Sequence, residues 1–580
     1  MSDAYHQLLA DLDAFVQDEH LAAEHKLRES WEQPLAQKLA KGLTQSFVRI
    51  ETTSDPKSLL AYLGDNESRF REGDLLLLHL GDPFQQLLAR RLALEADDGD
   101  RWRLRSHEPI TLLDDYDGGV CYADADTIDL RPFYEKAIAD IATSSIGQKT
   151  ILPLLAGHLE PEFDPSDCDH GEAVALSEGF NKKQAAAVGT AYGAQHIACI
   201  QGPPGTGKTK VLSLIARMLV ERGERVLLTS HTHMAINNAL NRIHRQKIPT
   251  VKIGRLTQTK GLDAEVDAVE AIGGWEDRPK HGGYVVGATP FATGSQRLDN
   301  YQFDTVIFDE ASQVTVPLAV MAMRTARKYI FIGDQKQLPP VVLSKSILEK
   351  DSFSVFARLI HRTLDAVMLD ETYRMNQWLT SWPSQTYYGR KLVSAGANRD
   401  RRLNLVTATT KSSLVNALDP QHSGVFIPTN DLNARTRNLD DAKLVVELCE
   451  AAIAGGLAPT EIGIVSPYRA QGKAIRNLLA AKLGKAVAQL IVADTVERMQ
   501  GQERELIILA MTTGDPVFLA AIAEFFFQPE RLNVSITRAM TKLIVIGPSE
   551  ERLPTSETDY VNGWIGQYRS FIETLKHIEV

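Results

Sequence analysis

The chain has 580 residues, of which 44% are apolar and 24% are charged, a composition typical of a globular protein with several domains. Its most apolar run, VFLAAIAEFFF, is too short to span a bilayer and contains Glu524, so no membrane segment is predicted. The four cysteines form no CxxC pair, which disfavours a zinc or iron–sulfur site. We expect a soluble, cytoplasmic protein.

The charge is divided unevenly along the chain. The net charge is −11, but residues 1–175 carry 16 basic and 34 acidic side chains, whereas residues 176–580 carry 47 basic and 40 acidic ones. An evenly acidic protein would disfavour a nucleic-acid partner. The basic surplus in the second part keeps such a partner possible.

The first 175 residues show two helical patterns around a strand-rich one. Residues 4–43 place Leu8, Leu12, Phe15 and Val16 on one helical face. Short strands and turns then predict a small β-module up to about residue 125. A second helical stretch, RPFYEKAIADIATS, leads into EPEFDPSDCDHGE, which we interpret as an acidic linker and domain boundary.

From residue 196 onward, apolar strands each end in a polar loop, and helical stretches separate several of them. This order predicts a parallel α/β sheet whose loops gather at the carboxyl ends of the strands. A second series begins near LDAVMLDETYR and contains no second phosphate-binding loop. We therefore expect two similar α/β lobes that share one nucleotide site.

The phosphate-binding loop is GPPGTGKT, between an apolar strand and an amphipathic helix. Its glycines let backbone N–H groups surround the phosphates, while the lysine reaches the β and γ oxygens and the last hydroxyl ligates Mg²⁺. The predicted ATP-binding residues of the loop are Gly202, Pro203, Pro204, Gly205, Thr206, Gly207, Lys208 and Thr209.

Two later strands end in groups suited to hydrolysis. DTVIFDE ends in Asp309, which we expect to hold Mg²⁺ together with Thr209, and in Glu310, which we expect to orient and deprotonate the attacking water. Gln337 in GDQKQLPP is placed to hydrogen-bond the γ-phosphate or that water.

Seven segments in order carry a specific resemblance: Gln184 in FNKKQAAAV, then GPPGTGKT, DEASQ, GDQKQLPP, TYRM, QGQE and RLNVSITRA. Together they resemble the motif set of superfamily 1B helicases of the up-frameshift family, the group that includes the immunoglobulin-mu-binding helicase and senataxin. The resemblance covers about residues 176–550. It implies two RecA-like lobes, ATP hydrolysis, and 5′→3′ movement on single-stranded DNA or RNA.

By layout, the N-terminal part resembles that family's β-barrel on a helical stalk. The expected fold is α/β, with two RecA-like parallel-sheet lobes, a stalk and a small barrel. The expected domains are a stalk at 1–43, a barrel at 44–125, a second stalk helix and acidic linker at 126–175, a first lobe at 176–347 with a basic insertion at about 241–283, and a second lobe at 348–580. Six basic and no acidic residues lie between Leu240 and Gly261. This run is interpreted either as a solvated face or as a wall of a strand channel.

The resemblance also implies roles for individual residues. Gln184 would read the adenine edge and Tyr373 would stack on the base. Arg374 and Arg538 would reach the γ-phosphate from within the same chain, and Glu503 would couple the nucleotide to the second lobe.

Three hydroxyls at strand ends, Thr232, Thr289 and Thr495, are candidates for contacts with nucleic-acid phosphates, although each also suits a cap or turn. The chain departs from the family at His231 and His233, where Pro and Asn are usual, and at Glu497 and Met499, where Asp and Phe are usual. These departures leave the choice between DNA and RNA open.

The predicted function is an ATP-dependent helicase or translocase, acting as a monomeric motor with Mg²⁺ as cofactor. The alternative is an ATPase that displaces proteins without unwinding. A GTPase-like switch is disfavoured, because the one NKK segment precedes the first core strand, and no nuclease motif is present. The barrel is expected either to act on the strand or to dock a protein partner.

Overall fold

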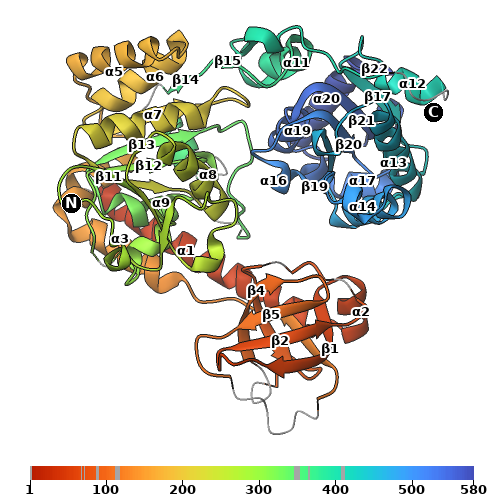
Figure 1. Cartoon of the computed structure of the whole chain (residues 1–580), viewed down its shortest axis with the longest axis horizontal. Helices are drawn as coiled ribbons and strands as arrows, with labels where there is room; N and C mark the ends of the chain where they lie inside the picture. The colour runs from red at the N-terminus through yellow and green to blue at the C-terminus, as the bar shows by residue number, and fades with distance from the viewer. Residues whose placement is uncertain are drawn as a thin grey trace.

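A computed structural model describes residues 3–66, 68–70, 72–85, 90–110, 118–298, 300–344, 353–362, 366–406 and 412–579. Figure 1 shows two α/β lobes side by side, with a β-barrel beneath them on a long N-terminal helix. Among the described residues, no helix combines the length and apolar character needed to cross a membrane.

The first lobe is built on an eight-stranded parallel sheet in the order β10-β9-β11-β8-β12-β13-β7-β14. Its strands are β7 (Ile197–Gln201), β8 (Arg225–Thr229), β9 (Thr250–Ile253), β10 (Asp267–Val269), β11 (Tyr284–Gly287), β12 (Thr305–Phe308), β13 (Lys328–Gly333) and β14 (Val367–Met368). One face packs against α6 (Lys182–Gly193), α7 (Lys208–Glu221) and α8 (His233–His244), and the other against α9 (Val316–Met323) and α10 (Val355–Arg362). Burial on both faces explains why these strands are continuously apolar.

The first lobe extends beyond residue 347, where the sequence placed its end; that expected boundary itself lies outside the described residues. The strand β14 pairs with β7, and Leu369 packs into the core of the first lobe. The sequence interpretation had assigned this stretch to the second lobe, because a two-residue strand carries no periodicity of its own. The basic segment at 241–283 is likewise part of the sheet, since it contributes β9 and β10.

The second lobe has a six-stranded parallel sheet in the order β19-β18-β20-β21-β17-β22. Its strands are β17 (Gly424–Pro428), β18 (Ile462–Ser466), β19 (Val492–Thr495), β20 (Arg504–Ala510), β21 (Ala539–Gly547) and β22 (Lys576–His577). Helices on one face include α13 (Leu439–Ala454) and α14 (Arg469–Leu483), and those on the other include α11 (Gln377–Tyr387), α19 (Pro529–Ile536) and α20 (Asp559–Glu573). The two predicted parallel-sheet lobes are confirmed.

The N-terminal module is a closed antiparallel barrel in the order β1-β2-β5-β4-β3-β6, as predicted. Its strands are β1 (Thr44–Thr52), β2 (Ser58–Leu63), β3 (Leu75–His79), β4 (Arg90–Asp97), β5 (Arg101–Arg105) and β6 (Cys121–Ala125). The barrel is carried by α1 (Asp3–Glu32) and α3 (Arg131–Thr143), whose apolar residues Leu8, Leu12 and Ile141 join the core of the first lobe.

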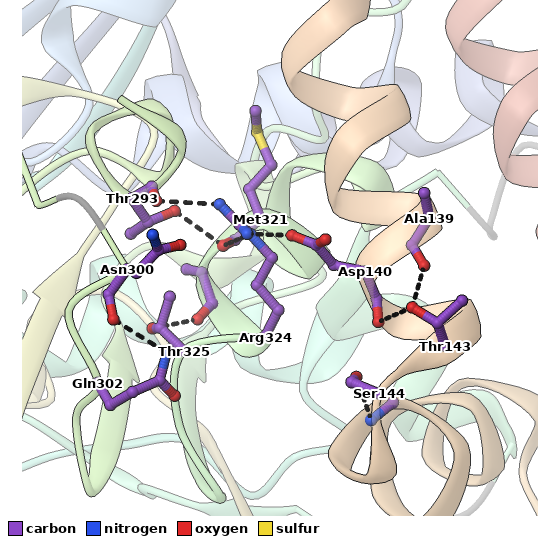
Figure 2. Close-up of polar contacts among 12 residues, drawn as sticks. Ala139, Asp140, Thr143, Ser144, Thr293, Asn300, Gln302, Met321, Arg324 and Thr325 are labelled. Atoms are coloured by element: carbon purple, nitrogen blue, oxygen red, sulfur yellow. Dashed lines mark hydrogen bonds and ion pairs between the residues drawn. The ribbon is translucent and has the colours of Figure 1, made fainter. Parts of the chain in front are cut away.

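A polar contact fixes the stalk to the first lobe. In Figure 2, Arg324, directly after α9, reaches Asp140 of α3 and also donates to the backbone oxygen of Thr293. The Thr293 hydroxyl donates in turn to the Met321 carbonyl over 2.8 Å. Because Arg324 is anchored by backbone groups of the lobe, it holds the stalk helix in one position.

The predicted acidic linker is half helical. The helix α5 (Pro165–Ser177) begins at Asp164, whose side chain accepts a hydrogen bond from Asp167 N, and it packs closely on α6. A side chain at Gly189 or Gly193 would collide with Cys168. These glycines let α5 and α6 pack closely. The sequence interpretation missed α5, because the acidic residues and prolines around its start are typical of a linker.

Candidate nucleotide site between two lobes

The phosphate-binding loop lies at the carboxyl end of β7 and opens α7. Gly205 and Gly207 have φ values of 73° and 84°, a region that favours glycine. A Cβ at Gly205 would also lie 2.4 Å from the Cβ of Arg374. Glycine is therefore needed both for the backbone turn and for the approach of the segment that leads into the second lobe. Lys208 Nζ donates to the Gly202 carbonyl over 2.8 Å, so it lies against the loop.

The two predicted carboxylates follow β12, next to the loop. Burial, followed by the neighbouring Glu310, raises the pKa of Asp309 to about 7, and Lys208 opposes the shift. Glu310 adopts a left-handed backbone conformation, with φ 49°, and its buried Oε2 has no hydrogen-bond partner among the residues that the structure describes. A non-glycine residue held in this conformation is typical of a functional site.

These oxygens fit Mg²⁺. Hydroxyl and carboxylate oxygens, here from Thr209 and Asp309, are the ligands that Mg²⁺ prefers, and the ion completes its shell with water and substrate phosphates. No group of three or more His, Cys, Asp or Glu side chains suited to a metal occurs in the described part of the chain. The donor set therefore suits a metal that arrives with a nucleotide.

His231 lies beside Glu310. Phe308 of β12 pairs with Thr229 of β8, and Asp309 N donates to Thr229 O over 2.9 Å, so the loops after the two strands run together. Burial lowers the pKa of His231, and Glu310 opposes the shift. The sequence interpretation noted His231 only as a departure from the family, whereas strand pairing makes it a neighbour of the expected catalytic base.

Gln337 belongs to a buried network that joins the lobes. Its Nε2 donates to Asp334 Oδ2 over 2.8 Å. The same oxygen accepts a 2.8 Å hydrogen bond from the Tyr388 hydroxyl, which accepts one of 2.8 Å from Asn533 of the second lobe. Asn533 also donates to the Lys336 carbonyl over 2.7 Å. Asp334, Tyr388 and Asn533 were missed from the sequence, although two of them lie inside quoted motifs.

Tyr388 permits a controlled test of this network. Tyr388→Phe is expected to lower the free energy of unfolding by about 1–3 kcal/mol, because it removes one hydrogen bond each from the buried side chains of Asp334 and Asn533, and the one to Asp334 is made to a charged group. Tyr387→Phe is the control, since the buried Tyr387 hydroxyl has no hydrogen-bond partner in the described part of the chain and its removal should be nearly neutral. Urea unfolding of both variants measures the difference, and equal stability would refute the role given to the network.

The two predicted arginines lie together on the second lobe. Arg374 Nε donates to Glu503 Oε2 over 2.6 Å, and its Nη1 donates to the Thr537 carbonyl over 3.1 Å. Arg538 is 1% exposed and is held by the Val534 carbonyl at 2.8 Å. Burial lowers the pKa of Arg538, Arg374 lowers it further, and Glu310 of the first lobe opposes the shift. Both guanidinium groups are thus held by backbone carbonyls, and Arg538 lies close enough to Glu310 of the first lobe to interact with its charge.

Gln184 and Tyr373 lie on the other side of the loop. Gln184 forms a capping box with Asn181 and donates from Nε2 to the Thr206 carbonyl over 3.0 Å. An amide has two N–H groups and two lone pairs, so one of each remains for an adenine edge. The Tyr373 hydroxyl accepts from Asn181 Nδ2 over 3.0 Å and donates to Glu371 over 2.9 Å. Its ring is 41% exposed, which suits stacking.

The three candidate threonines lie at carboxyl ends of strands. Thr232 caps α8, where it accepts from Ala235 N over 3.3 Å, and Thr289 follows the neighbouring strand β11. Thr495 ends β19 and precedes α16 (Val496–Met499). Figure 1 places α8 on the side of the first lobe that faces the second, and α16 and β19 on the facing side of the second lobe. The hydroxyls therefore belong to opposed edges of the two sheets.

Two family models, each described as an AAA domain, match residues 179–401 and 352–550. The DNA replication ATP-dependent helicase/nuclease DNA2 of Bos taurus is 30% identical over 66% of this chain and 38% of its own length. The DNA polymerase alpha-associated DNA helicase A of Schizosaccharomyces pombe is 27% identical over 68% of this chain and 67% of its own. These regions contain every motif of the site described above.

The chain is similar to ATP-dependent helicases over the part that contains this site. It spans about two fifths of the length of the DNA2 proteins it matches, 38% of the bovine and 41% of the human protein. A solved structure of the Arterivirus nonstructural protein 10 helicase shares 13% identity, with a TM-score of 0.39, over 92% of this chain and 82% of that one. The regions matched by the two family models overlap at residues 352–401, which include Tyr373 and Arg374, the segment that touches the phosphate-binding loop.

Proposed function

We propose that this chain is a superfamily 1 ATP-dependent helicase or translocase that moves 5′→3′ on single-stranded nucleic acid. The observation that carries the proposal is the approach of second-lobe groups to the first lobe: Arg538 interacts with the charge of Glu310, and Arg374 lies against Gly205 of the phosphate-binding loop. The site is therefore complete only when both lobes of one chain close. The motif set and the stalked barrel support a place within the up-frameshift family. The names of the DNA2 relatives support ATP-dependent action on DNA.

Each step of hydrolysis has a residue suited to it. Lys208 and the loop N–H groups would bind the β and γ phosphates, and Glu310 would accept a proton from the attacking water. Bound Mg²⁺, held by Thr209 and Asp309, would neutralise phosphate charge. Arg374 and Arg538 would stabilise the charge that develops on the γ-phosphoryl oxygens. Departure of the γ-phosphate after hydrolysis would remove the charge that holds the arginines, release the second lobe and move the strand.

The test first measures the rate of ATP hydrolysis at increasing concentrations of single-stranded DNA or RNA. It then measures the unwinding of 5′-tailed and 3′-tailed duplexes. Stimulation by a strand and unwinding of the 5′-tailed duplex are expected. The second candidate, protein displacement without unwinding, would instead give strand-stimulated hydrolysis and removal of a bound protein but no strand separation. An absence of stimulation by either polymer would contradict both.

We also propose that the barrel acts on the strand. Arg469 of α14 donates to the Arg69 carbonyl of the barrel over 3.0 Å, and Arg255 of the first lobe lies 3.4 Å from His107 of the barrel. A body in contact with both lobes would respond to their closure. Replacement of residues 44–125 by a Gly/Ser linker is expected to preserve basal ATP hydrolysis and weaken strand binding or unwinding. Unchanged unwinding and strand affinity would favour a docking role for a protein partner.

A further inference from the structure

Four basic side chains converge at the carboxyl edge of the first lobe's sheet, away from the nucleotide. Lys252 lies near the end of β9, and its Nζ is 3.1 Å from His233 Nδ1 at the start of α8 and 3.3 Å from the Ile253 carbonyl. Arg255 and Arg297 lie close enough to this pair for the charge of each to act on His233. The cluster, which we name the edge cluster, consists of His233, Lys252, Arg255 and Arg297.

No carboxylate neutralises the edge cluster by direct contact. Within the described ranges, none of its three permanently basic residues forms an ion pair with an acidic side chain, although Lys252 is only 2% exposed. Burial, followed by the charge of Arg297, lowers the pKa of Lys252 to about 8. Glu270 acts on Arg297 more weakly than Arg255 does. By contrast, Arg245 in the same segment pairs with Asp263 at 2.8 Å.

Uncompensated buried charge is costly, so a cluster of this kind is stabilised by an anion. The geometry also leaves donors available. Burial, followed by Lys252, Arg297 and Arg255, lowers the pKa of His233 to about 4, so its ring is neutral at pH 7. A neutral ring that accepts from Lys252 through Nδ1 carries its proton on Nε2, which is then a donor. Lys252 retains a third N–H beyond its two contacts.

The position of the edge cluster identifies the anion. His233 directly follows Thr232, and Lys252 pairs in register with Gly287, two residues before Thr289. The cluster thus continues the row of hydroxyls along the sheet edge. At its outer side, Arg255 meets His107 of the barrel. A single strand of nucleic acid that passes over Thr232 and Thr289 would next reach the edge cluster, between the first lobe and the barrel.

We propose that the edge cluster binds a phosphodiester group of single-stranded nucleic acid where the strand passes between the first lobe and the barrel. This inference rests on the proposed function and adds a site to it. Because the contacts would go to phosphate, binding would be independent of base sequence.

The test compares four full-length variants. Lys252→Met and Arg297→Gln each remove one charge from the cluster. Their matched controls are Lys247→Met and Arg242→Gln, exposed residues at the opposite ends of β9 and α8. The affinity of each protein for labelled oligothymidine, and for an abasic sugar-phosphate oligomer, is measured by fluorescence anisotropy between about 50 and 200 mM salt.

Each cluster variant is expected to lose about tenfold in affinity at low salt, the value of one charge-assisted hydrogen bond. The slope of log affinity against log salt should fall by about 0.7 for each lost contact. The abasic oligomer should show the same loss, the controls should match the parent, and basal ATP hydrolysis should not change.

If the parent protein binds and both cluster variants keep its affinity and its salt dependence, the phosphate site is overturned and the proposed function stands. A parent that binds neither oligomer would refute the proposed function and this site with it. If Lys252→Met fails to fold, the Arg297→Gln variant, at a half-buried position, decides the result alone.

Discussion

Glu310→Gln is expected to abolish measurable turnover while it preserves ATP binding. Removal of a general base typically costs about 10²- to 10⁴-fold in rate. Gln matches the size and shape of Glu, so it should retain the left-handed backbone at this position, φ 49°, and the packing beside His231. The measurement is steady-state hydrolysis together with the affinity for a fluorescent ATP analogue.

Lys208→Ala is the matched comparison, because it should impair phosphate binding itself. The two variants separate binding from chemistry: Glu310→Gln binds the analogue without turnover, whereas Lys208→Ala loses turnover and part of the affinity. Hydrolysis by Glu310→Gln at near the parental rate would refute its role as the base. In that event His231, the neighbouring side chain with an unpaired buried Nδ1, would become the next candidate.

The parts of the site that are local in sequence were predictable. The segment Gly202–Thr209 could be recognised from consecutive residues alone, because a phosphate-binding loop needs a strand, a glycine-rich turn and the start of a helix directly after one another. Asp309 and Glu310 similarly follow one apolar strand. The strand-rich N-terminal module also followed from its short strands and turns, and the barrel from the resemblance in layout to the helicase family.

Features that depend on distant pairs were not predictable. Asp334, Tyr388 and Asn533 form one network, yet they are separated along the chain by 54 and 145 residues. Nothing in the local pattern around Tyr388 distinguishes it from Tyr387, and only the fold gives one hydroxyl partners and leaves the other without any. The strand β14 was misassigned for the same reason, since its pairing with β7 decides its lobe.

The edge cluster also shows what the sequence alone could not predict. The basic run from Leu240 to Gly261 was visible, but its charges divide into different environments. Arg245 is neutralised by Asp263, whereas Lys252 is buried beside Arg297, which lies outside the run. Charge counting therefore located the region without separating a solvated face from a site.

Arg538→Ala is expected to reduce the rate of ATP hydrolysis by about 10³-fold, the lower end of what an arginine finger contributes. The side chain is held by backbone carbonyls within 2.8 and 3.4 Å, so its position is fixed before the nucleotide arrives. Arg538→Lys keeps a charge but loses the planar set of donors, and it should recover only part of the rate. Arg569→Ala, an exposed arginine paired with Glu550, is the control and should match the parent.

The same arginine tests whether one chain is sufficient. Because Arg538 and Lys208 belong to one molecule and the lobes meet within it, activity per molecule should not depend on protein concentration. A mixture of Lys208→Ala and Arg538→Ala proteins should therefore remain inactive. Recovered hydrolysis in the mixture would show that the arginine acts between subunits, because only a mixed pair could then combine an intact loop with an intact finger.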